Sequence, residues 1–224
     1  MPNWCMTLVN IKGDDERKLD ELADRFEEAL KSRYIVTDFG DNWLGNIVFY
    51  LEGDEYLPRE GETTEHNQRA ETFINTQPMR CRGEVCYIDR DKGELRMDIE
   101  SAWGPHIEPI KAMVDKYYPE AKVYYYAEEC GNALYMSNYE SDKDCYIFDF
   151  CDEKGLPDEL NFECREPQSM NYVATALRKV LGIPATDTAH SIDDLVEMCN
   201  EKYADYGGIH KIEFCEIEDI YKGD

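Results

Sequence analysis

Alternating apolar and polar positions predict a β-strand over residues 4–11. Trp4, Met6 and Leu8 fall on one side of this strand, and apolar residues also occupy most of the other side. Because both sides are fairly apolar, we expect a central strand that is covered on both faces of its sheet.

A helical period follows. Residues 15–32 carry apolar side chains three and four positions apart among charged ones, which is typical of an amphipathic helix. Asp14 is placed to cap its N-terminus. Two strands are then expected, around residues 34–36 and 47–51, with a turn between them.

The polar residues 52–82 have little hydrophobic period and indicate an insertion or long loop, with a short helix over 63–74. The next segment predicts a β-hairpin. Its strands, 85–88 and 95–99, flank the acidic turn 89–93.

A second amphipathic helix is expected over residues 106–118, and Pro119 ends it. Three more strands are expected, over residues 121–127, 134–138 and 145–150. The order strand, helix, strand, strand, helix, strand is that of the split βαβ, or ferredoxin-like, fold. The predicted fold class is therefore α+β: a ferredoxin-like antiparallel sheet with two helices on one face, extended by extra strands.

The last third of the chain differs in character. Residues 152–168 are acidic and contain prolines, which indicates a linker. Ser169 caps an expected helix, and Ser191 with Asp194 forms a capping box for another. A final strand is expected over residues 209–217. This gives two expected domains, 1–151 and a helix–helix–strand unit at 152–224 that docks on the first.

Charge narrows the set of partners. Acidic residues number 49 and basic residues 24, for a formal net charge of −25. Such a chain repels nucleic acid and anionic lipid, so direct nucleic-acid binding and membrane binding are not expected. The excess indicates either simple solubility or an acidic surface for a basic partner, one version of which copies the charge layout of DNA.

The nine cysteines are odd in number and irregularly spaced, which favours free thiols over a disulfide framework. The N-terminus lacks the basic and apolar regions of a signal peptide. No apolar run is long enough to span a bilayer. We therefore expect a cytoplasmic protein.

The sequence contains no complete motif for metal binding, nucleophilic catalysis or phosphate binding. The four histidines are far apart, and the pair Cys81 and Cys86 has no second pair to complete a zinc site. Residues 89–100 imitate a calcium loop, but Gly93 is one position early. Nucleophile elbows and phosphate-binding loops are also missing. No catalytic residue, metal ligand or cofactor is assigned.

One segment with candidate site residues is the expected strand-to-helix corner at 100–106. It combines a carboxylate, an indole and an imidazole in Glu100, Trp103 and His106. Trp103 is either a core side chain that fixes the corner or an aromatic anchor for a ligand.

The other candidate segment is the tyrosine-rich strand at 121–127 with the acidic residues after it. Alternation places Tyr124 and Tyr126 on one face, and Glu128 and Glu129 follow. This is either a half-buried strand with a solvated end or a patch of tyrosines and carboxylates that binds a basic partner.

Four motifs in order resemble the YubB-type proteins of conjugative plasmids, phages and other mobile elements. They are Met-Pro-Asn-Trp-Cys at the start of the chain, Glu-Ser-Ala-Trp-Gly-Pro at 100–105, Lys-Tyr-Tyr-Pro ending at Pro119, and Tyr-Ala-Glu-Glu-Cys-Gly at 126–131. The resemblance spans about residues 1–150 and implies a ferredoxin-like fold, but it implies no particular reaction. The chain departs from the family at its corner, where Gly104 separates Trp103 from Pro105.

Three hypotheses of function follow. The first is an interaction protein that binds a basic protein through an acidic, tyrosine-rich surface. The second is a small hydrolase or metal-assisted enzyme with a site near Glu100, Trp103, His106 and Glu128, which requires the imidazole and carboxylates to meet in one pocket. The third is an accessory subunit, which could form a homodimer through the final strand.

Overall fold

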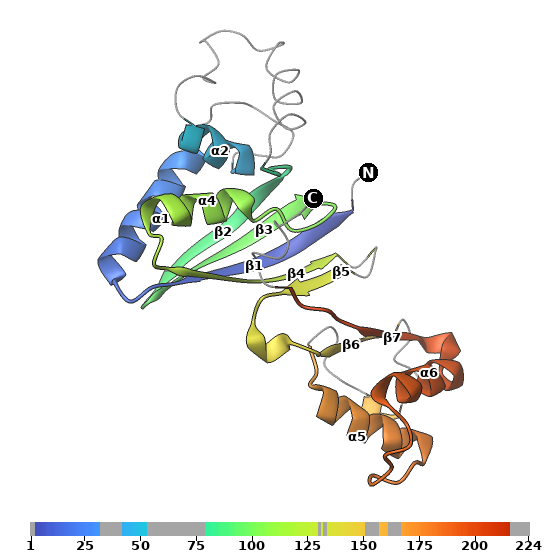
Figure 1. The fold of residues 1–224 in the computed structure, drawn as a ribbon. Coiled ribbons are helices and arrows are strands. Elements are labelled where there is room, and N and C mark those ends of the chain that lie inside the picture. The colour runs from blue at the N-terminus through green and yellow to red at the C-terminus, as the bar shows by residue number, and fades with distance from the viewer. Residues whose placement is uncertain are drawn as a thin grey trace. The chain divides into compact units, whose positions relative to one another are not determined.

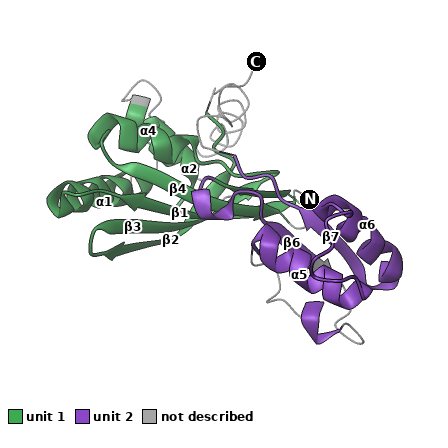
Figure 2. Ribbon diagram, turned by 60° about the horizontal axis from the view of Figure 1, so that its bottom comes forward, with its two compact units in different colours: residues 1–137 green, residues 138–224 purple. Residues whose placement is uncertain are grey.

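The computed structural model describes most of the chain in two compact units, residues 1–137 and 138–224 (Figure 2). The division precedes the boundary expected after residue 151. The described residues are 3–31, 42–52, 79–129, 131, 134–150, 157–160 and 167–215. The expected strand at 34–36 and the expected short helix at 63–74 lie outside them.

Unit 1 is a mixed α+β structure built on a five-stranded antiparallel sheet. The strands lie in the order β2-β3-β1-β4-β5, so β1 is central. The elements of the unit are β1 (Trp4–Lys12), α1 (Glu16–Lys31), α2 (Leu44–Glu52), β2 (Gly83–Asp91), β3 (Glu94–Ala102), α4 (Glu108–Tyr117), β4 (Lys122–Glu129) and β5 (Leu134–Ser137).

Helix α1 confirms the amphipathic pattern, since the apolar positions read from the sequence are its buried ones. Its cap differs from the prediction. The Lys18 backbone N–H donates to Asp15 Oδ1 at 3.2 Å, so the capping side chain is Asp15 and not Asp14. The Asp15 N–H in turn donates to the Tyr118 hydroxyl at 3.0 Å, which ties the start of α1 to the end of α4.

The strand expected at 47–51 is wrong, because these residues belong to helix α2. Leu44, Ile47 and Val48 are buried at helical spacing, and the helix contacts α1, α4 and β2. A short apolar run does not distinguish a buried strand from a buried helix by its period alone, and packing decides here. The described part of unit 1 thus has three helices where two were expected.

The three helices lie on one face of the sheet (Figure 1). Along β1, Cys5, Val9 and Ile11 are buried beneath them. Trp4, Met6 and Leu8 point to the other face and are 46%, 38% and 53% exposed. The expectation that both faces of β1 are covered is therefore wrong: the strand is central, but its second face lies open.

The predicted hairpin and the later strands of unit 1 are confirmed. Strands β2 and β3 pair as far as Asp91 and Glu94, which leaves Lys92 and Gly93 as a two-residue turn. Gly93 has φ +79°, a left-handed conformation that glycine adopts without steric cost. Helix α4 ends before Pro119, as expected, because the proline ring disfavours a helical conformation in the residue that precedes it.

Unit 2 has its own core, formed where two helices pack beside a two-stranded sheet. Its regular elements are β6 (Tyr146–Phe150), α5 (Met170–Leu181), α6 (Ile192–Lys202) and β7 (Gly207–Lys211). The side chains of Tyr146, Leu177 and Leu195 meet in this core. Both predicted caps are confirmed, with Ser169 on α5 and the complete box of Ser191 and Asp194 on α6.

Two boundaries in unit 2 differ from expectation. Strand β6, assigned from sequence to the first domain, pairs with β7. Part of the expected linker belongs to the core, because Leu160 is buried there and Gln168 bridges to Tyr146. The acidic residues and prolines of this segment are typical of a linker, and they conceal the one apolar side chain that packs into the core. The final strand ends at Lys211, and residues 216–217 lie outside the described part.

Across the described residues, no helix is both long and apolar enough to cross a lipid bilayer.

The two faces of β1 predict that truncation of two neighbouring residues will change stability by very different amounts. Val9→Ala should lower the free energy of unfolding by about 2 kcal/mol, because it leaves a cavity in the core. Leu8→Ala should change it by no more than about 0.5 kcal/mol, because Leu8 lies on the open face. Urea unfolding of both variants measures this. A large loss in Leu8→Ala would mean that the face is covered.

Candidate functional site

The most distinctive surface of unit 1 is the face of the sheet opposite the helices. It carries large apolar side chains from two strands: Trp4, Met6 and Leu8 from β1, and Tyr87 from β2, which is 56% exposed. Trp103 follows β3 at the end of the sheet where Trp4 lies, and it is 57% exposed. Apolar side chains gathered in this way are typical of an interaction surface.

Carboxylates alternate with these apolar side chains across the strands. Met6 of β1 lies opposite Glu100 of β3 on one side and Glu128 of β4 on the other. Glu84 of β2 lies opposite Glu100, which completes a row of three glutamates, and Asp98 lies between Leu8 and Tyr87 in the next row. We call this surface the open face and define it as Trp4, Met6, Leu8, Glu84, Tyr87, Asp98, Glu100 and Glu128.

The acidic charge of the open face is not neutralised within the part of the chain that the structure describes. None of its four carboxylates forms an ion pair with a described residue. Toward the β2–β3 turn the pattern changes, because Arg96 pairs with Glu94 and Asp91, and Lys12 pairs with Glu94. The unpaired negative charge is therefore concentrated at the end of the sheet that holds Trp4.

A β-bulge brings three polar groups together within the open face. Val85 pairs with Ile99 and Tyr87 with Asp98, so Cys86 is an extra residue in β2 without a partner in β3. The Cys86 thiol and the carboxylates of Glu84 and Glu100 offer one atom each, all within 4.8 Å of one another.

The pKa values of this cluster reflect its crowding. Burial, and then the charge of Glu100, raise the pKa of Glu84. Burial, followed by the charges of Glu100 and Glu84, raises the pKa of the Cys86 thiol. Both shifts have the sign expected where like charges share a half-buried site. Of the three residues, only Glu100 was a candidate from sequence, because the others join it through cross-strand register and a bulge that periodicity does not reveal.

The tyrosine strand is arranged as the alternation predicts. Tyr125 is fully buried, while Tyr124 and Tyr126 lie on the side of Glu128. The Tyr126 hydroxyl donates to Glu128 Oε2 at 3.4 Å, and Lys12 Nζ lies 5.8 Å from the centre of the Tyr124 ring. Glu129 differs, since it is 1% exposed on the covered side, and its Oε2 forms no hydrogen bond with a described residue. It cannot reach a partner from there.

Trp103 lies in a strained corner of the backbone and is exposed there. Its φ of +71° is in the left-handed region, which costs a bulky residue roughly 1–3 kcal/mol. Its N–H donates to the Asn3 carbonyl at 2.9 Å, and the Ser101 hydroxyl donates to the Gly104 carbonyl at 2.8 Å. These bonds hold the corner, and the indole points away from the core, so Trp103 is not the core tryptophan that the alternative interpretation expects.

His106 is buried, and it lies apart from Glu128. It is 6% exposed, and its Nδ1 accepts a hydrogen bond from the Arg82 backbone N–H at 3.0 Å. Burial, then the charges of Arg80 and Arg82, lower the pKa of His106 to about 4. Arg82 precedes β2, and two strands separate β2 from Glu128 in β4, about 14 Å at normal strand spacing. The structure does not bring this imidazole and this carboxylate together.

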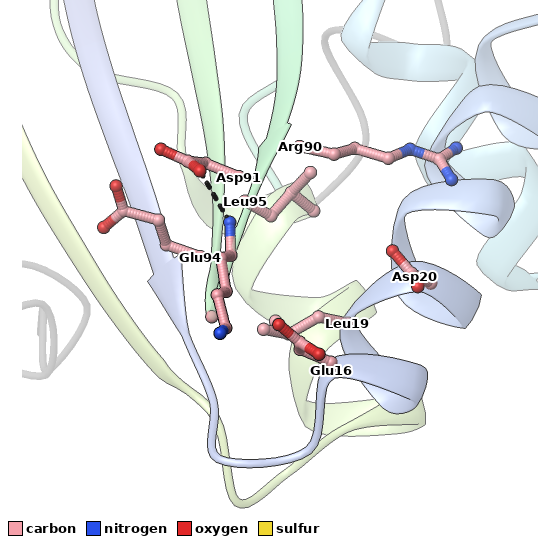
Figure 3. Close-up of a pocket in the computed structure, with 9 residues that line it drawn as sticks. Glu16, Leu19, Asp20, Arg90, Asp91, Glu94 and Leu95 are labelled. Atoms are coloured by element: carbon pink, nitrogen blue, oxygen red, sulfur yellow. Dashed lines mark hydrogen bonds between the residues drawn. The ribbon is translucent and has the colours of Figure 1, made fainter.

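A pocket of about 280 Å³ lies between the β2–β3 turn and the first turns of α1 (Figure 3). Its lining mixes Glu16, Asp20, Asp91 and Glu94 with Arg90 and Lys92. Arg90 is already paired with Asp24 and Glu27 of α1. This pocket therefore mixes both signs of charge, whereas the charged side chains of the open face are all acidic.

Comparison of the chain with protein-family models, with curated proteins and with solved structures finds no match in any of the three.

The buried imidazole predicts an acid-sensitive element of stability. In the unfolded chain His106 takes up a proton near pH 6.5, whereas the folded state resists this until about pH 4. The wild type should therefore lose on the order of 3 kcal/mol of stability as the pH falls through this window.

His106→Asn should remove that loss, because an amide oxygen can accept the Arg82 N–H bond and does not titrate there. His106→Ala should cost about 1–3 kcal/mol at pH 7, because the buried N–H is left unpaired. Urea unfolding of the three proteins between pH 7 and pH 4 gives the comparison. Equal pH dependence in wild type and His106→Asn would contradict the neutral, structural role of this residue.

The cross-strand glutamates predict a stabilising substitution. Like charges directly opposite in a sheet are unfavourable, so Glu100→Gln should raise the free energy of unfolding by about 0.2–1 kcal/mol at pH 7 in the presence of a chelator. The gain should shrink with falling pH, because the raised pKa of Glu84 means that it is protonated earlier in the fold than in the unfolded chain.

Glu128→Gln is the matched control, because Glu128 faces Met6 and Tyr135 rather than another carboxylate. It should leave stability almost unchanged. If Glu100→Gln were destabilising under the same conditions, the repulsion between the two glutamates would not be a property of the fold.

Proposed function

We propose that this protein acts by binding a basic protein partner through the open face. The observation that carries the proposal is a row of three glutamates, Glu84, Glu100 and Glu128, that form no ion pair with a described residue and lie among exposed apolar side chains. Opposite charge on the partner would neutralise this row, and the remaining acidic charge of a chain of −25 would steer the approach.

The aromatic residues at this end of the sheet give the proposed interface its anchors. Trp4 and Trp103 flank the end of the β1–β3 pair, and Tyr87 lies in the next strand. Tryptophan and tyrosine often carry most of the energy of an interface, and their faces also attract the cationic groups of arginine and lysine. The partner should therefore present arginine or lysine side chains together with apolar ones.

Within this proposal unit 1 has a ferredoxin-like fold. The order β2-β3-β1-β4, with α1 between β1 and β2 and α4 between β3 and β4, supports that assignment. Membership of the YubB-type family, and with it a mobile-element setting, is part of the same proposal. It rests on the four sequence motifs alone.

The version with DNA mimicry needs two parallel rows of carboxylates. Across the described strands the acids of the open face form one row, with Asp98 beside it. Neighbouring strands are about 4.8 Å apart, so this row follows the strand spacing of the sheet. The partner that we propose is accordingly a basic protein surface. The open face does not have the two carboxylate rows that would imitate DNA in a DNA-binding groove.

Charge reversal on the open face tests the proposal. The full chain is immobilised, and proteins of the host lysate are captured at low and at high salt. The double variant Glu100→Lys and Glu128→Lys should reduce capture of the basic partner by more than about tenfold at low salt, because it replaces attraction by repulsion. Capture by the wild type should fall as salt is added.

Two further variants make the result interpretable. Glu197→Lys with Glu201→Lys changes the net charge equally on the exposed side of α6 and should capture normally. Trp103→Gly should fold well, because glycine suits the left-handed corner, yet should weaken capture. A partner held equally by the wild type and all variants would refute the open face as its binding site.

A further inference from the structure

The bulge in β2 interrupts the regular alternation of side chains at Cys86. Glu84 and Tyr87 face the open side and Val85 faces the core, so the extra residue Cys86 is inserted between them and remains exposed. Bulges commonly redirect a side chain beside a functional site. Here the bulge sets Cys86 beside the facing carboxylates of Glu84 and Glu100.

The distances in this cluster suit a single small cation. Zinc binds thiolate sulfur at about 2.3 Å and carboxylate oxygen at about 2.0–2.2 Å, so tetrahedral ligand atoms lie roughly 3.5 Å apart. The donor atoms of Glu84, Cys86 and Glu100 already lie within 4.8 Å of one another. Side-chain rotations on fixed strands can close the remaining gap, so the backbone does not have to move.

The electrostatics of the cluster also call for a cation. Glu84 and Glu100 face each other directly, an unfavourable pair, and no described cationic side chain pairs with either. A divalent cation would relieve this repulsion, because it neutralises the carboxylates and favours a thiolate ligand.

The kinds of donor atom restrict the choice of metal. Calcium and magnesium prefer sites made only of oxygen, whereas a thiolate with carboxylates suits zinc and similar divalent transition metals. Three protein ligands leave a fourth position for water or for a ligand from another molecule. That position would lie on the open face, beside Met6.

We propose that Glu84, Cys86 and Glu100 form a three-ligand site for a zinc-like divalent transition metal. The site does not depend on the proposed protein partner, although it shares the open face. Metal binding by the isolated chain and capture of a partner are therefore separate measurements, and either proposal can fail alone.

Cobalt(II) serves as the probe, because a cobalt–thiolate bond produces a charge-transfer absorption band that carboxylates alone do not produce. Titration of the reduced, metal-free full chain with Co²⁺ should give this band with one equivalent bound, and Zn²⁺ should abolish it by displacement. Binding should release the thiol proton and strengthen as pH rises.

Three variants locate the metal. Cys86→Ser should eliminate the band, and Glu84→Gln or Glu100→Gln should weaken cobalt binding by more than about tenfold, since loss of a mere outer-shell partner already costs 10- to 100-fold. Cys215→Ser is the matched control, because this partly exposed thiol lies in unit 2. It should keep the band unchanged.

Glu100→Gln also shows whether weak cobalt binding results from a lost ligand or from misfolding. The metal-free variant should be at least as stable as the wild type and still bind cobalt poorly. The proposal is overturned if the wild type gives no thiolate band, if the band survives in Cys86→Ser, or if Cys215→Ser removes it.

Discussion

The structure of unit 1 depends on the position of β1 at the centre of a sheet: helices cover one side of this strand, and its side chains on the other side are exposed. Strand β1 pairs with β3 and with β4, and successive side chains point in opposite directions. Cys5, Val9 and Ile11 therefore pack under the helices, while Trp4, Met6 and Leu8 point outward. A register slip of one residue would exchange these two sets, so burial of one face holds the arrangement of the other.

Everything functional that we propose follows from this constraint. The cross-strand register aligns Glu84, Glu100 and Glu128 in one row, because each lies opposite the next or opposite Met6. Toward the hairpin turn, arginine and lysine form ion pairs with the acids, whereas at the other end no cationic side chain of the described residues does so. The fold thus separates a salt-bridged region from an acidic, apolar one on the same sheet, and the bulge at Cys86 adds a thiol to the acidic part.

Local sequence patterns predicted the helices, turns and caps of this protein better than they predicted which faces of these elements are buried. The buried side of α1, the hairpin turn and both caps of unit 2 could be read from spacing and residue type, since those signals lie within a few residues. Helix α2 and the open side of β1 could not, because an apolar run looks the same in either environment and only packing decides. Of the residues in the proposed site, the sequence pattern had singled out Glu100, Trp103 and Glu128, whereas Glu84 and Cys86 join them only through strand register and the bulge. His106 and Glu129 were candidates by residue type, and burial removes them from the surface.

The central claim is that the face of β1 with Met6 lies open in the free protein. Oxidation by dilute hydrogen peroxide, followed by peptide mass spectrometry, measures this, because solvent-exposed methionines are converted to the sulfoxide first. Met6 is 38% exposed, whereas Met97 is 1% and Met113 0% exposed, so these two are internal controls. The account predicts rapid oxidation of Met6 while Met97 and Met113 stay protected. Protection of Met6 equal to that of Met97 would contradict it.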